Sequence, residues 1–305
     1  SGSTGIPVEI YGTSVSRGYW AALTVRDHRT VARDATQRYG AIRYLKKENR
    51  GEQGIRMPNW GGPVAELEQT VLGFGLHISH KPEVLAYWLG RVNPADLMTY
   101  PSVALELLRS DTRPPPALQE INFMAEPLDR ELRLELEQEW RVRVSETYSA
   151  NECGYIAMPC ERNRLHVQCE TLLFELLNDD DKPCQIGEQG RVVVTTLKNL
   201  ATPLLRYELG DYATLGEPCD CGRHSPVLEN ILGRVRNYAT APDGSRFWPG
   251  ALGKLRTIEP VIQNQFVQVA IDTIDMHLVL ARPLTSAEEV AVVTKVRESL
   301  AMSTL

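Results

Sequence analysis

Residues 187–234 read GEQGRVVVTTLKNLATPLLRYELGDYATLGEPCDCGRHSPVLENILGR. Within this stretch, residues 191–197 are rich in β-branched side chains, which predicts a strand. A second apolar segment leads to Gly210-Asp211, which we expect at the end of another strand. A carboxylate presented there can accept hydrogen bonds from both hydroxyls of a ribose. The alternative for Asp211 is an ordinary turn aspartate that caps neighbouring amides.

The order of motifs in this stretch resembles that of the adenylate-forming superfamily, and most closely its phenylacetate–CoA ligase-like branch. The motifs are GExGxxxxTxL, PLLRYxxGD, CxCGR and a later GR. The resemblance implies that Asp211 holds the ribose of ATP and that Arg234 reaches the same nucleotide. It also implies an α/β fold with a large adenylation domain, expected over residues 1–234, and a small α+β domain over residues 235–305. Superfamily members carry more chain, so we expect the large domain to be incomplete at its N-terminus and the small one truncated.

Composition and charge narrow the functional classes. The chain has 305 residues, 43% of them hydrophobic and 24% charged, as in an ordinary globular protein. A net charge of −6 argues against nucleic acid or an anionic membrane as partner. We expect no membrane span, because no apolar run approaches about 18 residues. The six cysteines do not have the pattern of a disulfide scaffold, and no signal peptide opens the chain, so a cytoplasmic setting is expected. The oligomeric state is open, a dimer included.

The first residues form a candidate phosphate-binding loop. Small hydroxyl residues and glycines let backbone N–H groups approach a phosphate closely. The stretch has no GK[ST] ending, so it is not a Walker loop. A flexible terminus or a cloning scar is the alternative. With the Pro and Tyr that follow, SGSTGxPxxxY resembles the superfamily's loop for the β- and γ-phosphates of ATP. The loop residues are Ser1, Gly2, Ser3, Thr4 and Gly5.

A strand predicted over residues 121–123 ends at Ala125-Glu126-Pro127. The resemblance implies that this strand end contacts adenine. Glu126 could instead lie in the first turn of the next helix, where its charge is favourable. Apolar residues recur every four positions from Leu128 to Trp140, which predicts an amphipathic helix before the next strand at residues 141–144.

That next strand leads to Tyr148-Ser149-Ala150-Asn151-Glu152. Alternating strands and helices, with polar residues after the strands, indicate an α/β sheet whose site lies at the strand ends. The motif resembles the superfamily's YxxTE, which implies that Tyr148 stacks on adenine and that Glu152 binds Mg²⁺. A carboxylate suits this hard cation. Asn151 stands where threonine is usual, and it can still donate to the α-phosphate.

Other segments carry predictions of structure. The arginine-rich residues 16–49 are expected to be largely helical, with their charges in solvent. Trp60, beside two glycines, either walls a ligand pocket or packs in the core. Residues 266–280 suggest a β-hairpin, and Ser286 with Glu289 predicts a capping box for the last helix.

A structural zinc site is predicted from Cys219 and Cys221, whose thiols can meet at one ion, with Cys160 and His166 as the second pair. Zinc takes four sulfur or imidazole ligands in a tetrahedron. The alternative is that the cysteines are small buried hydrophobes and His166 a strand residue with a local partner. Cys169 and His224 are possible substitute ligands.

Three functions follow from these residues and the resemblance. The first is an acid–thiol ligase that activates a carboxylic acid with ATP and Mg²⁺ and passes the acyl group to coenzyme A or a carrier protein. Aryl acids are suggested by analogy alone. The second is a degenerate nucleotide-binding relative, supported by Asn151, by Arg236 in a usually acidic position, and by the lack of a matching glycine-flanked lysine. The third, a zinc-dependent interaction module, is disfavoured by the net charge.

Overall fold

The computed structural model describes residues 8–57, 60, 72–234, 239–242, 246–247, 255, 258 and 260–303. The candidate phosphate loop at residues 1–5 lies outside the described residues. The chain divides into two compact units, Ser1–Ile231 and Leu232–Leu305. The predicted domain boundary after Arg234 stays a prediction, because β12 runs across this division.

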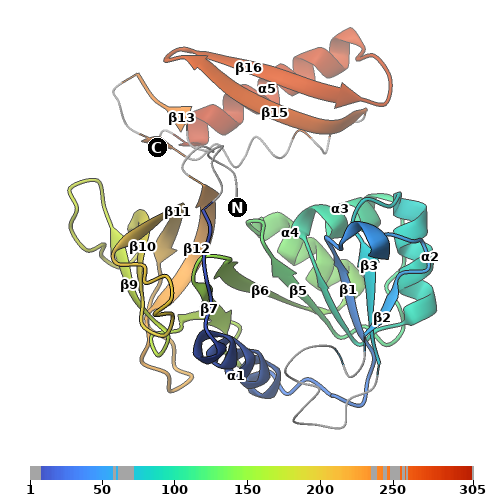
Figure 1. Ribbon diagram of the computed structural model, residues 1–305. Coiled ribbons are helices and arrows are strands. Elements are labelled where there is room, and N and C mark those ends of the chain that lie inside the picture. Colours follow the sequence, from blue (N-terminus) through green and yellow to red (C-terminus); the bar gives the residue numbers. More distant parts are fainter. Residues whose placement is uncertain are drawn as a thin grey trace. The chain divides into compact units, whose positions relative to one another are not determined.

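The described strands of the first unit, with β12, form one twelve-stranded sheet (Figure 1). Its order is β2-β3-β1-β4-β5-β6-β7-β8-β12-β11-β10-β9. The strands are β1 (Tyr39–Arg43), β2 (Ile55–Met57), β3 (Gly73–His77), β4 (Asp96–Thr99), β5 (Glu120–Met124), β6 (Arg143–Ala150), β7 (Gly154–Pro159), β8 (Leu165–Val167), β9 (Leu172–Leu177), β10 (Gln189–Thr196), β11 (Tyr207–Leu215) and β12 (Val227–Arg234).

Strand β6 joins two halves of different construction. It pairs in parallel with β5, and the parallel half continues through β4 and β1 to β3. On its other side β6 pairs antiparallel with β7, and the pairs β7–β8, β8–β12, β10–β11 and β9–β10 are antiparallel too. The carboxyl end of β6 therefore lies where the two halves meet, which is the end that carries the YSANE motif.

Helices cover both faces of the parallel half. Helices α2 (Pro82–Val92), α3 (Pro101–Arg109) and α4 (Arg130–Glu135) bury their apolar faces against Ile121, Phe123 and other alternate strand residues. Because successive strand residues point to opposite faces, the residues between them face away from this core. Helix α1 (Ser14–Thr30), which lies beside β7 (Figure 1), supplies residues that meet that opposite face. Polar side chains from α1 and from the strands gather there in a layer beneath the helix.

Two helical predictions were only partly right. Residues 16–49 were expected to be largely helical, but α1 ends at Thr30 and β1 follows at Tyr39. The helix predicted from Leu128 to Trp140 begins after its N-cap Asp129, and residues 136–140 are π-helical. Its buried face is as expected, because Leu132, Leu136 and Trp140 are all buried.

Trp60 is a core residue. Its ring stacks on Tyr39 with the ring centroids 5.3 Å apart, and its indole N–H donates to the Gln37 carbonyl at 2.8 Å. Only 5% of the residue is exposed, which decides between the two alternatives that the sequence left open. The neighbouring Asn59, Gly61 and Gly62 lie outside the described residues.

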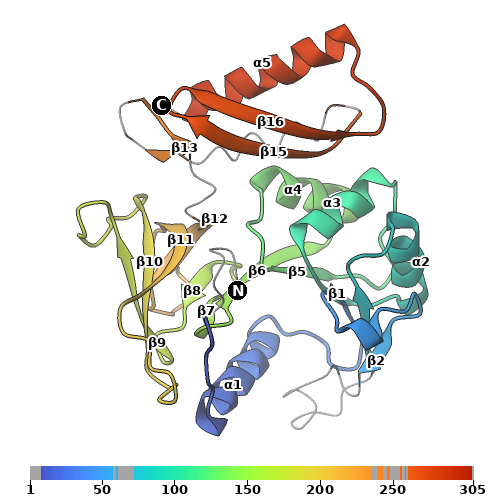
Figure 2. The same cartoon turned by 45° about the horizontal axis from the view of Figure 1, so that its top comes forward.

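The second unit contains the predicted β-hairpin and last helix. β15 (Val261–Ala270) pairs antiparallel with β16 (Thr273–Leu280), and α5 (Ser286–Ser303) lies along the hairpin (Figure 2). Val292 of α5 packs with Val261 and Phe266 in a small apolar core. A short pair, β13 (Ala239–Thr240) and β14 (Arg246–Phe247), is joined to the hairpin because Gln268 bonds both the N–H and the carbonyl of Thr240 at 2.8 Å.

The capping box of α5 lies one residue before the predicted one. The side chain of Glu288 accepts from the backbone N–H of Thr285 at 2.8 Å, and the Thr285 hydroxyl accepts from the Glu288 N–H at 3.4 Å. The predicted pair, Ser286 and Glu289, falls inside the helix instead. Both pairs share the same spacing, so the sequence pattern alone could not separate them.

Thr285→Ala is expected to lower the free energy of unfolding of this unit by about 1 kcal/mol, because it removes an N-cap acceptor. Ser286→Ala, at the next residue, serves as the matched control. It should change the free energy of unfolding by only about a few tenths of a kcal/mol, since alanine is a good helix former. Urea unfolding of both variants measures the difference. Equal losses, or a larger loss for Ser286→Ala, would contradict this assignment of the cap.

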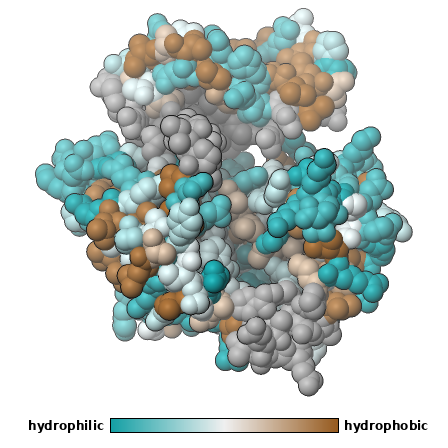
Figure 3. All heavy atoms as spheres, in the orientation of Figure 1, coloured by the Kyte–Doolittle hydropathy of each residue, from teal (hydrophilic) through white to brown (hydrophobic). Residues whose placement is uncertain are grey.

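The surface of the first unit is mixed in character. Figure 3 shows hydrophilic residues over much of one face and a hydrophobic patch over the β9 and β10 edge. Leu173, Leu200 and Leu205 are among the exposed apolar side chains of this half. Among the described residues, no helix has both the length and the apolar character needed to cross a membrane.

Candidate functional site

Two of the predicted nucleotide-binding residues are hydrogen-bonded to each other. The Tyr148 hydroxyl donates to Asp211 Oδ2 at 2.8 Å, and both residues are buried. Tyr148 lies within β6, which begins later and runs further than the strand predicted at residues 141–144. The bond joins the parallel and antiparallel halves of the sheet, because Tyr148 comes from β6 and Asp211 from β11.

Asp211 lies in the middle of β11 and not at a strand end, which corrects the prediction. The pairing of β10 with β11 shifts register between Arg191 and Val193, so β11 carries extra residues opposite Val192. Gly210 has a positive φ of 74°, a conformation that glycine adopts without strain. A bulge of this kind re-aims the next side chain. The glycine of the RYELGD motif therefore has a structural role in setting the direction of Asp211.

Asn151 and Glu152 lie in the turn between β6 and β7. Asn151 is exposed and Glu152 is buried. The next residue, Cys153, links this turn to Asp211: burial raises the pKa of its thiol to about 12, and the nearby carboxylates of Glu152 and Asp211 add to the rise. Two carboxylates predicted to serve one nucleotide thus lie close to one thiol.

The Ala125-Glu126-Pro127 segment follows the carboxyl end of β5. Glu126 does not lie in the first turn of the next helix, because α4 begins at Arg130 with Asp129 as its cap. Its carboxylate instead accepts from the Ser102 N–H at 3.0 Å and the Ser102 hydroxyl at 2.9 Å, at the N-terminus of α3. There it interacts favourably with the helix dipole.

The remaining nucleotide-binding predictions are only partly described. Arg234 is the last residue of β12 and follows Gly233, whose φ is 81°. The Ser1–Gly5 loop and Arg236 lie outside the described residues. Their predicted roles stay predictions.

The four predicted zinc ligands come together. One donor atom from each of Cys160, His166, Cys219 and Cys221 lies within 4.8 Å of the others. The sulfurs of Cys160 and Cys219 are 3.8 Å apart, and Cys221 Sγ lies 3.4 Å from His166 Nε2. In a tetrahedron with zinc–sulfur bonds of about 2.3 Å, neighbouring sulfurs are separated by about 3.8 Å. The donors therefore have the identity and spacing that zinc requires.

Local structure orients this cluster. Cys160 directly follows β7 and His166 lies in β8, while the other two ligands come from the loop between β11 and β12. His166 Nδ1 lies 3.3 Å from the Ser225 hydroxyl, which leaves Nε2 directed at the thiol of Cys221. Among the described residues, the cluster includes neither of the substitutes, Cys169 and His224.

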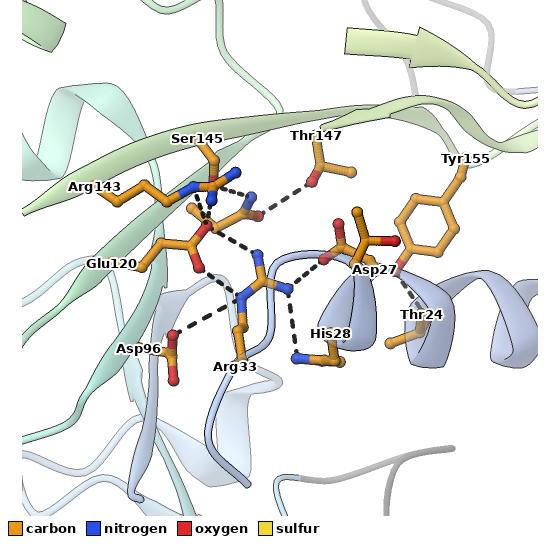
Figure 4. Close-up of polar contacts among 12 residues, drawn as sticks. Thr24, Asp27, His28, Arg33, Asp96, Glu120, Arg143, Ser145, Thr147 and Tyr155 are labelled. Carbon is orange, nitrogen blue, oxygen red and sulfur yellow. Dashed lines mark hydrogen bonds and ion pairs between the residues drawn. The ribbon is translucent and has the colours of Figure 1, made fainter. Parts of the chain in front are cut away.

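A buried charged layer beneath α1 escaped the sequence analysis. Arg33 was expected to lie in solvent, but only 4% of its side chain is exposed. Its guanidinium donates to both carboxylate oxygens of Glu120, at 2.8 and 3.0 Å, and to Asp27 (Figure 4). One signal was available: Asp96 and Glu120 each come directly before apolar residues, and carboxylates that are buried require partners.

Comparison with known proteins identifies the fold of this chain. No family model matches the chain. Over 97% of its length the chain superposes on a 2-hydroxyisobutyryl-CoA ligase bound to an acyl-adenylate, with a TM-score of 0.71, 17% identity and 69% of that chain covered. An o-succinylbenzoate-CoA synthetase from Bacillus subtilis gives a TM-score of 0.67 at 14% identity, with 97% of this chain and 61% of that one covered. The chain therefore has the fold of the adenylate-forming ligases, and the predicted fold class is confirmed.

Two curated proteins resemble the sequence itself. A phenylacetate-coenzyme A ligase from Thermus thermophilus is 34% identical over 117 residues, which cover 36% of this chain and 26% of that ligase. Protein CapK from Staphylococcus aureus is 22% identical over 275 residues, covering 83% of this chain and 60% of CapK. The chain thus spans less than two thirds of either relative. The similarity to a phenylacetate-coenzyme A ligase agrees with the branch that the motifs indicate.

Proposed function

We propose that this chain is the nucleotide-binding part of an acid–thiol ligase, which uses ATP to convert a carboxylic acid into an acyl-adenylate. The observation that carries the proposal is the buried hydrogen bond between Tyr148 and Asp211, near Glu152. These residues come from the two motifs that resemble the superfamily, and they approach one another although 63 positions separate Tyr148 from Asp211. The adenylate-forming fold supports the same reaction.

In the proposed reaction, a carboxylate oxygen of the acid attacks the α-phosphorus of ATP, and pyrophosphate leaves. A thiol sulfur then attacks the carbonyl carbon, AMP leaves, and the thiol loses its proton. Asp211 would accept hydrogen bonds from the ribose hydroxyls, since a carboxylate offers about four acceptor sites and Tyr148 uses one of them. Holding the nucleotide in this way supplies positioning, which accounts for a large part of many rate enhancements.

The residues at the end of β6 would act on the phosphates. Glu152 would hold Mg²⁺, which when bound would neutralise charge on the phosphates. Asn151, exposed beside it, would donate from its amide to the α-phosphate. The two residues lie in one short turn, so they would act on neighbouring groups of a single nucleotide.

Several finer features belong to the same proposal. The acceptor is coenzyme A, with a carrier-protein thiol as the alternative, and the acid is a small molecule. The zinc at Cys160, His166, Cys219 and Cys221 is structural, because four protein ligands leave no position for water. A reducing cytoplasmic setting suits the six free cysteines.

A second candidate function is a nucleotide-binding relative that no longer forms adenylates. Asn151 in place of threonine favours it. Pyrophosphate exchange into ATP separates the two, measured on the full-length protein against a panel of aryl, alkyl and amino acids. Exchange that requires an acid and Mg²⁺ is the expected result. ATP binding without exchange for any acid would favour the second candidate.

A further inference from the structure

A cavity of about 150 Å³ lies between α1 and the adjoining face of the parallel sheet. An apolar cavity of this size accommodates a ligand such as benzene, so this one suits a small acid with about one ring. Much of its wall is apolar or aromatic, supplied by Trp20, Tyr39, Met98, Met124, Tyr155 and Met158. It runs along β5 from Glu120 to Met124, a rise of about 13 Å.

One end of this cavity adjoins the proposed adenylation site. Thr147 and Ser149 of β6 line it, and Asn151 and Glu152 follow directly in the next turn. Arg43, exposed at the carboxyl end of β1, lines the cavity as well. The far end is lined by Asp96 and Glu120, which begin β4 and β5. An acid whose carboxylate lies at the first end would extend its other end toward these carboxylates.

The far end has more acidic than basic groups (Figure 4). Arg33 pairs with Glu120 and Asp27, and its Nε lies 3.8 Å from Asp96 Oδ1. The second guanidinium there, Arg143, lies 3.8 Å from Glu120 Oε1. Three carboxylates therefore face two cations. Burial raises the pKa of Asp96 to about 7, although the Arg33 guanidinium acts in the opposite direction.

The nearby histidine does not supply the missing positive charge. Burial and the adjacent Arg33 guanidinium lower the pKa of His28 to about 4, so its ring is neutral at pH 7. Its Nδ1 lies 3.4 Å from Arg33 Nη1.

Asp27 provides the independent observation that points to a ligand. Its side chain is 9% exposed, and while Oδ2 accepts from Arg33, the buried Oδ1 has no hydrogen-bond partner among the described residues. A buried acceptor without a donor costs free energy, and the cost is larger when the group is charged. Asp27 is also one of the residues that line the cavity, so a ligand bound there would lie beside this carboxylate.

We propose that the acid bound here carries an amino group at the end remote from its carboxylate, and that Asp27 binds this group as an ammonium. This inference rests on the proposed function, which makes the cavity the binding site of the acid. It adds the chemical class of that acid. An ammonium supplies the donor that Asp27 Oδ1 lacks and the positive charge that the far end lacks. The aromatic walls add attraction for a cation.

The test compares pairs of acids that differ only in this group. Suitable pairs are 4-(aminomethyl)benzoate with 4-ethylbenzoate, and 5-aminopentanoate with hexanoate. In the full-length protein, kcat/KM for pyrophosphate exchange is expected to favour each amino acid over its isostere by about tenfold or more, the value of one charged hydrogen bond. Asp27→Asn should abolish the preference, and Asp27→Glu, which keeps the charge, should retain part of it.

Each outcome separates this inference from the proposed function. A preference is a ratio within one protein sample, so partial unfolding of a variant cancels from it. Exchange that is equal for both members of each pair, or better with the isostere, overturns the inference and leaves the ligase function standing. If no acid supports exchange, calorimetric binding of the same pairs decides: amine-selective binding that Asp27→Asn abolishes supports the inference, and its absence overturns it.

Discussion

Asp211→Ala is expected to weaken ATP binding about tenfold to a hundredfold, measured by calorimetry on the full-length protein with Mg²⁺ present. The substitution removes a charged acceptor from the ribose hydroxyls, and a hydrogen bond to a charged group contributes about 1.5–3 kcal/mol. Each 1.4 kcal/mol corresponds to about a tenfold change in the dissociation constant. The buried Tyr148 hydroxyl also loses its acceptor, so a modest loss of stability should accompany the change.

Two variants separate these effects. Tyr148→Phe keeps the carboxylate and removes only its 2.8 Å partner, so ATP binding should weaken by less than in Asp211→Ala. Asp180→Ala removes an exposed carboxylate beyond β9 and should leave ATP affinity unchanged. Wild-type affinity in Asp211→Ala, with the protein folded, would show that this carboxylate does not hold the nucleotide.

Sequence reasoning reached the residues of this site but not their local geometry. The motifs RYELGD and YSANE predicted that Asp211, Tyr148 and Glu152 act together, and the two motifs do meet at the joint between the halves of the sheet. The position of Asp211 within β11 could not be read in this way. It depends on a bulge, which arises from pairing with β10 and leaves only one local signal, Gly210.

The polar layer beneath α1 shows a second limit. An arginine in a charged, helix-like segment is usually in solvent, and Arg33 departs from this because carboxylates from two distant strands surround it. Asp96 and Glu120 lie far from it in the sequence, so the three-way contact is a property of the parallel register. Periodicity predicts which face a strand buries, but not which charges meet beneath a helix.

The convergence of the four predicted zinc ligands could be foreseen for the opposite reason. Cys219 and Cys221 are separated by one residue, so local spacing alone brings their thiols together. Cys160 and His166 bracket the turn between β7 and β8, and this turn approaches the later loop because β12 pairs with β8. Two short-range sequence patterns and one strand pairing are therefore sufficient to bring these four residues together.

Purified protein is expected to contain one zinc ion per chain, and Cys219→Ser with Cys221→Ser should lose it and unfold at a lower temperature. A metal that binds only the folded state stabilises it by about 4 kcal/mol when free metal exceeds the dissociation constant about a thousandfold. Loss of the zinc ion should also disturb the proposed nucleotide site. The cluster ties the strand that follows Glu152 to the loop that follows the strand of Asp211.

Elemental analysis and thermal unfolding, each with and without a chelator, make the measurement. Cys169→Ser is the matched control, because this exposed cysteine lies outside the four-residue cluster. It should keep both the metal and the melting temperature of the wild type. Protein purified without stoichiometric zinc would refute the site, and retention of zinc by the double serine variant would refute its ligands. A chelator should reproduce the double variant's melting temperature in the wild type, since both remove the same constraint on the β7–β8 turn.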